Sequence, residues 1–389
     1  METVFADLKG NFGKLDYVAA WYTKAAGLLA SDLNAKTECA FVSTNSICQG
    51  ESVATMWKPL FEQRGLEITF AWQTFVWNSE SFEKAHVHCV IVGFSCNVEK
   101  NSVVQQKSAV VEPVETTSKQ NSANGGFDTH SVLLNHRLKR IFSADGICVE
   151  AKNINGYLLD APNLFIESRG KPLTAGLSKM SKGIQPTDGG NLIISAEERA
   201  ELLAKYPNAQ KFVRQYISAD DFINGKARYC LWLKGIASNE YSKIKPIIER
   251  LEKVREMRLK SPTAGVRRDA DTPMLFTQIR QPETDYLVVP EVSSENRRYI
   301  PIGFMSKDII VSNMIYAVPD ASLYLFGVLI SNVHMAWMRT VGGRLKSDYR
   351  YTPAVYNNFP FVMTGGNDEA ARNKGLKPLD SAHFHCTDR

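Results

Sequence analysis

The stretch Leu66-Glu-Ile-Thr-Phe-Ala-Trp-Gln-Thr-Phe-Val76 decides the fold of the first part of this 389-residue chain. Its large apolar side chains alternate with polar ones, which predicts a strand with one buried face. Other elements are expected around it: a helix at 15–29, a strand at 39–42, a helix at 53–61 and an apolar strand at 87–94. A helix, a strand, a helix and two strands joined by a short loop predict the C-terminal half of a Rossmann-like α/β sheet with an antiparallel edge.

The composition is that of an ordinary globular protein with two or three domains. Hydrophobic residues make up 44% and charged residues 22%, and the net charge is +5. No apolar run is long enough for a transmembrane helix, and the N-terminus does not have the pattern of a secretory signal. The seven cysteines are scattered and form no Cys-x-x-Cys pair, which favours a reduced, cytoplasmic protein.

The composition changes after the first strands. Residues 97–130 are polar with few aromatics and indicate a linker or long loop, and a mixed α+β domain is expected over 131–362. Within that domain, Ser195 and Glu198 form a capping box for a helix at 196–205. The polar residues 363–389 are expected to be a disordered tail.

The most suggestive stretch in the second half is Arg344-Leu-Lys-Ser-Asp-Tyr-Arg-Tyr351. It follows an apolar helix expected over 321–341, with Asp320 as its N-terminal cap, and a strand is expected at 299–302. Arginine, lysine, serine and tyrosine are the residues that contact phosphate groups, and Arg297 and Arg298 add charge nearby. The sequence therefore suggests a nucleic-acid surface, although the same charges also suit a solvated face or a helix end.

The sequence gives less support for a metal site, a catalytic serine or a nucleotide-phosphate loop. His86, His88 and Cys89 lie close in sequence, but residues 86 and 88 share a strand face that Cys89 does not. No second pair at ligand spacing completes a tetrahedral set, since His383 and His385 lie in the polar C-terminal tail. No metal site is therefore expected. The sequence contains no Gly-x-Ser-x-Gly, Gly-x-Gly-x-x-Gly or Walker motif.

Several distinctive motifs occur in both parts of the chain. The first part contributes Ala40-Phe-Val-Ser-Thr-Asn-Ser-Ile-Cys-Gln-Gly50 and His86-Val-His-Cys-Val-Ile-Val-Gly-Phe-Ser95. The second part contributes Pro186-Thr-Asp-Gly-Gly190, Tyr299-Ile-Pro-Ile-Gly-Phe304 and Gly343-Arg-Leu-Lys-Ser-Asp-Tyr-Arg-Tyr351. These motifs resemble those of adenine DNA methyltransferases of the gamma type, and more specifically the large single-chain restriction–modification enzymes of the MmeI type. The resemblance covers about residues 10–362.

The resemblance implies the C-terminal portion of such an enzyme. Residues 1–96 would be half of the catalytic fold and 131–362 the target-recognition domain, with double-stranded DNA as the partner. The family's Asn-Pro-Pro-Phe motif and its glycine-rich S-adenosylmethionine site are absent from this sequence. We therefore expect no catalytic or cofactor-binding residue in this chain and no activity on its own, although the intact enzyme would use S-adenosylmethionine.

The resemblance also suggests roles for individual residues. Trp77, with Phe75 and Phe82 as runners-up, would stack on a base flipped out of the duplex. The turn Ser306, Lys307 and Asp308 would read base edges. The DNA backbone would be contacted by Arg297, Arg298, Arg344, Lys346, Tyr349 and Arg350.

Two other interpretations remain open from sequence. The chain would serve as a DNA-binding specificity module or scaffold if a separately encoded methyltransferase or nuclease part completes it. An unrelated metalloenzyme using His86 and His88 would require stoichiometric metal. A further expectation is that the strand near Phe41 lacks its usual parallel neighbour and leaves an apolar edge.

Overall fold

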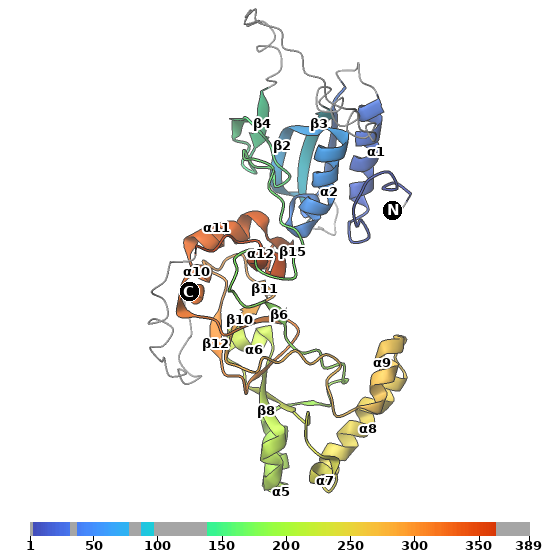
Figure 1. Ribbon diagram of the computed structural model, residues 1–389, viewed down its shortest axis with the longest axis vertical. Coiled ribbons are helices and arrows are strands. Elements are labelled where there is room, and N and C mark those ends of the chain that lie inside the picture. The colour runs from blue at the N-terminus through green and yellow to red at the C-terminus, as the bar shows by residue number, and fades with distance from the viewer. Residues whose placement is uncertain (1–2, 32–36, 78–86, 97–137, 363–389) are drawn as a thin grey trace, which may run out of the picture. The chain divides into compact units, whose positions relative to one another are not determined.

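The chain has a mixed α/β fold with several sheets, which divides into two compact units, Met1–Ser168 and Arg169–Arg389 (Figure 1). The computed structural model describes residues 3–31, 37–77, 87–96 and 138–362. In these ranges no helix is both long enough and apolar enough to cross a membrane.

The first unit is built on one five-stranded sheet in the order β1-β3-β2-β4-β5. Strand β3 is antiparallel to both β1 and β2, whereas β2 and β4 are parallel. The elements of this unit are α1 (Val18–Ser31), β1 (Cys39–Thr44), η1 (Asn45–Cys48), α2 (Gly50–Arg64), β2 (Leu66–Trp77), β3 (Val87–Cys96), β4 (Lys139–Phe142) and β5 (Cys148–Ala151).

Aromatic packing joins the two helices of this unit to its sheet. Tyr22 of α1 is fully buried, and its ring centroid lies 5.4 Å from that of Trp57 in α2 and 5.3 Å from that of Phe94 in β3. The Tyr22 hydroxyl shares a 3.0 Å hydrogen bond with Ser43 Oγ, which satisfies its polar end. Helix α2 ends at Gly65, whose left-handed φ of 62° suits a residue without a side chain.

The division between the units differs from the expected domain boundary at residue 131. Strand β4 pairs with β2, and β5 pairs with β4, so both strands extend the first sheet rather than beginning a second domain. The sequence signal was weak because both strands are short and irregular. The expected linker at 97–130 and the expected tail at 363–389 lie outside the described residues.

The second unit contains three small sheets, in the orders β12-β10-β14-β6, β13-β8-β9-β7 and β11-β16-β15. Its strands are β6 (Ser181–Lys182), β7 (Ile193–Ile194), β8 (Val213–Ile217), β9 (Arg228–Leu231), β10 (Tyr286–Pro290), β11 (Val292–Ser293), β12 (Gly303–Met305), β13 (Ile310–Val311), β14 (Ile315–Pro319), β15 (Gly343–Leu345) and β16 (Asp348–Arg350). Its helices are α5 (Ala196–Lys205), η2 (Pro207–Phe212), α6 (Ala219–Asn224), α7 (Ser238–Tyr241), α8 (Lys245–Leu259), α9 (Ala264–Arg268), η3 (Asp269–Asp271), α10 (Leu323–Leu329), α11 (Asn332–Val341) and α12 (Pro353–Asn357).

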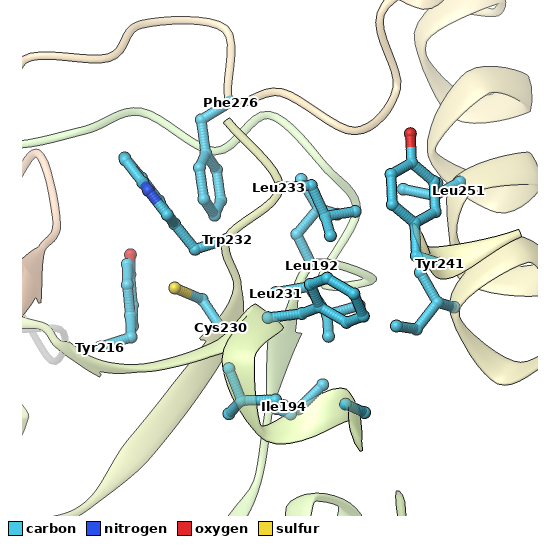
Figure 2. Packing of buried hydrophobic residues seen from close by; sticks show 14 of the residues in the cluster. Leu192, Ile194, Tyr216, Cys230, Leu231, Trp232, Leu233, Tyr241, Leu251 and Phe276 are labelled. Carbon is cyan, nitrogen blue, oxygen red and sulfur yellow. The ribbon is translucent and has the colours of Figure 1, made fainter. Parts of the chain in front are cut away.

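One hydrophobic core of this unit lies between the β7–β9 region and helices α7 and α8. Figure 2 shows Leu192 and Leu231 from the strand side beside Tyr241 and Leu251 from the helices. On the other side of the cluster, Trp232 packs against Phe276, with 5.8 Å between their ring centroids. The strands and helices of this region therefore share one apolar interior.

Arg258 of α8 is fully buried and joins distant segments of the second unit. Its guanidinium donates hydrogen bonds to five backbone carbonyl oxygens, those of Pro186, Thr187, Asp269, Thr272 and Leu275, at 2.7–3.2 Å. Burial lowers the pKa of this group below its ordinary value, with carboxylates opposing the shift. A buried guanidinium is tolerable because its N–H groups are satisfied.

Two expected elements of the second unit differ in the structure. The apolar helix predicted over 321–341 is two helices, because Ser331 accepts a hydrogen bond from the His334 backbone N–H and starts α11. Ser322, rather than Asp320, caps α10. The strand predicted at 299–302 is irregular, and the pairing begins at Gly303 in β12.

Candidate nucleic-acid interface

The predicted basic segment forms a β-hairpin of β15 and β16, which follows α11 directly. Gly342 links α11 to β15. A Cβ at this position would lie 2.5 Å from the Met338 carbonyl oxygen, so the close approach requires glycine. Lys346 occupies the turn with a left-handed φ of 57°. Strand β16 also pairs with β11, which fixes the hairpin to the rest of the unit.

The register of the hairpin separates its two arginines. Arg344 pairs with Tyr349, and Gly343 pairs with Arg350. Residues paired across an antiparallel ladder share a face, and neighbours along a strand alternate, so Arg344 and Arg350 project to opposite faces. The hairpin therefore has a Tyr349 face, with Arg344 and Tyr349, and a Glu291 face, with Arg350 and Glu291.

On the Tyr349 face, the guanidinium carbon of Arg344 lies 4.0 Å from the centroid of the Tyr349 ring. Arg344 also donates to the Ser347 carbonyl oxygen at 2.9 Å and lies 3.8 Å from the Glu295 carboxylate. Arg339 of α11 donates to the Tyr349 hydroxyl at 3.2 Å. These contacts hold two cations at one aromatic side chain.

On the Glu291 face, Arg350 donates from Nε and Nη2 to Oε1 of Glu291 at 3.1 and 3.0 Å. The Glu291 side chain is only 5% exposed, whereas that of Arg350 is 49% exposed. Arg350 therefore forms an ion pair with Glu291.

Arg297 and Arg298, two further predicted DNA-backbone contacts, lie in the loop before β12. Arg298 is exposed, with its guanidinium 5.2 Å from the Tyr299 ring, and its carbonyl oxygen accepts a 3.5 Å hydrogen bond from Arg339. This contact places the Arg298 backbone beside the Tyr349 face. Arg297 is half-buried in the same loop.

The predicted base-reading residues form the turn between β12 and β13. The backbone N–H of Lys307 donates to Asp285 and that of Asp308 to Ser306 Oγ, at 3.0 and 3.3 Å. Both side chains are exposed, and Asp308 lies 4.0 Å from Arg214. Ser306 Oγ therefore helps to form the turn, whereas the Lys307 side chain is exposed and can contact a ligand.

Trp77 ends β2 in the first unit and has 48% of its surface exposed. Its ring centroid lies 6.3 Å from that of Phe75, which is half-buried. Phe82 lies outside the described residues. Trp77 is therefore a surface residue at a strand end rather than part of the core.

Three glycines of the first unit have packing or capping roles. A Cβ on Gly93 would collide with the Phe70 ring, one on Gly156 would collide with Val53 and Trp57, and Gly65 ends α2. These glycines serve packing and capping rather than a phosphate or nucleoside cradle. In the same described ranges no three His, Cys, Asp or Glu side chains are grouped to hold a metal, and His86 lies outside them.

Sequence reasoning missed two residues of this candidate interface, Lys182 and Glu291. Both are far in sequence from the basic segment, so no local pattern marks them. Lys182 reaches the hairpin through Glu291, with its Nζ 2.8 Å from Oε2 of that carboxylate.

Comparisons with known proteins agree with this picture. Residues 160–363 match the family described as "MmeI, target recognition domain", and residues 1–106 match "MmeI, DNA-methyltransferase domain". The chain is 38% identical over 364 residues to DNA methyltransferase A of Bacillus subtilis (strain 168), a match that covers 92% of this chain and 36% of that relative. It thus spans about a third of the length of this curated relative.

A solved structure of the Type IIL restriction–modification enzyme MmeI in complex with DNA superimposes with a TM-score of 0.77 at 39% identity. The similarity covers 95% of this chain and 45% of the solved chain. Both halves of the sequence are thus matched in order, and the target-recognition match alone spans more than half of it. The chain therefore belongs to the MmeI family, with sequence from its DNA-methyltransferase and target-recognition domains.

Proposed function

We propose that this chain supplies sequence-specific recognition of double-stranded DNA for an S-adenosylmethionine-dependent adenine methyltransferase of a restriction–modification system. The observation that carries the proposal is the match of residues 160–363 to a target-recognition domain, in a fold similar to a DNA-bound relative. A role on DNA implies a cytoplasmic location. The six cysteines in the described ranges are free thiols, in keeping with that compartment.

The hairpin and the loop before β12 would contact the DNA backbone. Arg297, Arg298, Arg344, Lys346, Tyr349 and Arg350 are the proposed contacts, and Ser306, Lys307 and Asp308 would read base edges. Cations and neutral donors position a protein on phosphates, whereas side chains in the grooves supply sequence discrimination. The exposed side chains of Lys307 and Asp308 on a backbone-supported turn suit the second task.

The first unit would be the C-terminal half of a Rossmann-like catalytic domain, and Trp77 would stack on the flipped adenine. We propose no methyl transfer by this chain alone, because the sequence lacks the Asn-Pro-Pro-Phe and glycine-rich motifs of the family. When bound to an intact enzyme, S-adenosylmethionine would supply the methyl group. What this chain contributes is docking and base recognition.

A second proposal is that a separately encoded catalytic part completes the chain. The free edge of β1 supports it, since in the described sheet β1 pairs only with β3 and Val42 is 53% exposed. A neighbouring gene that encodes Asn-Pro-Pro-Phe and a glycine-rich motif would favour this assembly. Its absence from the neighbourhood would favour a stand-alone specificity module or a decayed gene fragment.

Binding of labelled duplex DNA tests the recognition role directly. We expect fluorescence anisotropy to show binding that weakens steeply between about 50 and 200 mM salt, because phosphate contacts release counterions. Lys346→Gln removes an exposed charge and should lower the salt slope by about one.

The matched control is Lys245→Gln, which removes a charge from a side chain that is 81% exposed at the start of α8. This variant should bind like the unaltered chain. If the unaltered chain shows no salt-dependent binding, the recognition role is wrong. If the two variants are indistinguishable, Lys346 is not a contact.

A further inference from the structure

One face of the strand pair β8–β9 carries two arginines among aromatic side chains. Arg214 pairs with Cys230 and Tyr216 pairs with Arg228, so these four side chains share a face. Trp232 lies two residues beyond Cys230 and belongs to the same face by the alternation of a strand. Figure 2 shows Tyr216, Cys230 and Trp232 at one side of the apolar cluster.

The ring of Trp232 supports the Arg214 side chain. The guanidinium carbon lies 5.5 Å from the centroid of that ring, within the range of a cation–π contact. Trp232 is only 7% exposed and packs against Phe276, so the ring is a fixed support. The Arg214 side chain is 37% exposed, so its charged end reaches solvent while its position is held.

The two arginines differ in how they use their hydrogen-bond donors. Arg228 donates from Nε to Oδ2 of Asp221 at 2.8 Å, and that carboxylate is 3% exposed, so Arg228 has a structural partner. Arg214 has Nη1 4.0 Å from Oδ1 of Asp308, which is an ion pair beyond hydrogen-bond reach. Within the described ranges Arg214 makes this ion pair and the ring contact but no hydrogen bond. Its N–H donors are therefore available to a ligand.

The sheet places Arg214 beside the proposed base-reading turn. Strand β13, which follows the turn at 306–308, is parallel to β8, with Ile310 opposite Tyr216. Two residues earlier along both strands, this register brings Asp308 next to Arg214, in agreement with the 4.0 Å ion pair. The Asp308 side chain is 73% exposed. The arginine and the turn thus form one continuous surface of the second unit.

We infer that Arg214 is a further specificity-determining residue, which reads a guanine of the DNA target, and that Asp308 and Trp232 are positioning residues for its guanidinium. The inference rests on the proposed DNA-recognition function and deepens it by assigning a base type to a residue outside the turn. A guanidinium can donate two parallel hydrogen bonds to O6 and N7 of guanine, the commonest specific contact with a base. Because the ring and the carboxylate hold the guanidinium before DNA arrives, less side-chain entropy is lost on binding.

Selection by the full chain from a randomised duplex library gives the preferred sequence and tests the inference. Each G·C pair of that sequence is then changed to A·T, and the affinities are compared by fluorescence anisotropy. We expect the unaltered chain to favour guanine by roughly 5- to 100-fold at the position that Arg214 reads. Arg214→Gln should lose this preference at that position alone, because an amide suits adenine rather than guanine.

The matched control is Arg255→Gln, which removes an arginine charge from the exposed surface of α8. This variant should keep every base preference of the unaltered chain. The melting temperature of each variant provides the check on folding.

Asp308→Asn separates positioning from simple electrostatics. It removes a negative charge from the surface, so an electrostatic effect alone would strengthen binding to every duplex and leave the base preferences unchanged. A positioning role instead lowers the preference for the same guanine that Arg214→Gln affects, because the guanidinium loses one of its two supports.

The outcomes distinguish the inference from the proposed function. If the unaltered chain enriches no sequence and shows no salt-dependent binding, the proposed function fails and the inference with it. If it enriches a sequence and Arg214→Gln matches Arg255→Gln at every guanine, the inference alone is wrong. Equal weakening of all duplexes by Arg214→Gln would make Arg214 a phosphate contact and overturn guanine reading, as would a preferred sequence without a G·C pair. An unchanged guanine preference in Asp308→Asn would overturn the positioning role of Asp308.

Discussion

At the scale of single residues, His334 is the titratable group that the second unit buries beside a cluster of aromatic rings. It is 1% exposed at the start of α11, shares a 2.8 Å hydrogen bond with the Tyr351 hydroxyl and packs 4.7 Å from the Phe359 ring. Its Nδ1 has no hydrogen-bond partner among the described residues. Burial lowers the pKa of His334 from 6.5 to about 4, so the ring is neutral at physiological pH.

This histidine makes the stability of the second unit depend on pH. The unfolded chain binds a proton near pH 6.5 and the folded chain only near pH 4, so stability is complete above pH 6.5 and falls as the pH drops toward 4. We expect a loss of roughly 3 kcal/mol over that window, measured by urea unfolding at a series of pH values.

His334→Gln removes the titration while keeping a polar group that can reach Tyr351. The difference in pH dependence between the two proteins isolates His334 from the carboxylates that titrate in the same range. Equal pH dependence in both proteins would show that His334 does not control this loss.

Trp77 is the residue with the most direct predicted role in base flipping. In an enzyme completed with the catalytic half of a relative, Trp77→Ala should weaken productive binding by about 1–3 kcal/mol, the value of one base–aromatic stack. Trp77→Phe should keep most of the activity. The measurement is methyl transfer as a function of DNA concentration.

Trp21 provides the matched control for this test. It is a tryptophan of the same unit with similar exposure, 56% against 48%, but it lies on the exposed face of α1. Equal effects of Trp77→Ala and Trp21→Ala would remove Trp77 from the site.

At the scale of elements, the turn between β12 and β13 pairs backbone N–H donors with side-chain acceptors, which are Asp285 and Ser306. Backbone N–H groups form the turn, and the side chains of Lys307 and Asp308 are exposed. Exchanging the two residues in a completed enzyme should therefore leave folding intact and change which DNA sequence is methylated. Sequencing of methylated sites provides the measurement, and weaker methylation at unchanged sites would limit these residues to backbone contacts.

The elements that the sequence predicts well are those with strong local signals. Helix α5 begins with the Ser195–Glu198 capping box as expected, because capping chemistry acts within one turn. The break between α10 and α11 was missed because the apolar pattern continues through Ser331. A single serine cap is a weaker signal than many apolar residues in sequence.

The candidate interface shows the same limit. The basic segment is visible in the sequence, but its division into two faces depends on the register of a hairpin that the sequence does not mark. Glu291 and Lys182 lie 109 residues apart, and only tertiary pairing brings them together. The family motifs in the sequence indicate the function, whereas the ion pair of Lys182 with Glu291 becomes visible only in the folded structure.

At the scale of the whole molecule, we propose that the sequence for DNA recognition is in this chain and the sequence for methyl transfer is not. The proposed DNA contacts other than Trp77 lie in the second unit, and the motifs for methyl transfer are absent from the 389 residues. We expect no incorporation of labelled methyl groups into unmodified genomic DNA by this chain. Addition of a catalytic half that carries both motifs should restore incorporation, and activity of the chain alone above a no-enzyme control would contradict the proposed division.

The buried guanidinium of Arg258 has a consequence for motion within the second unit. One side chain of α8 holds carbonyl groups of the 186–187 segment and of the 269–275 segment at once. If either segment opens, the guanidinium loses hydrogen-bond acceptors while it is still buried. Its unpaired N–H groups then raise the free energy of the partly open state, which favours opening of the other segment as well. Segments far apart in sequence therefore open together rather than fraying one by one, and they form a single cooperative unit of local unfolding.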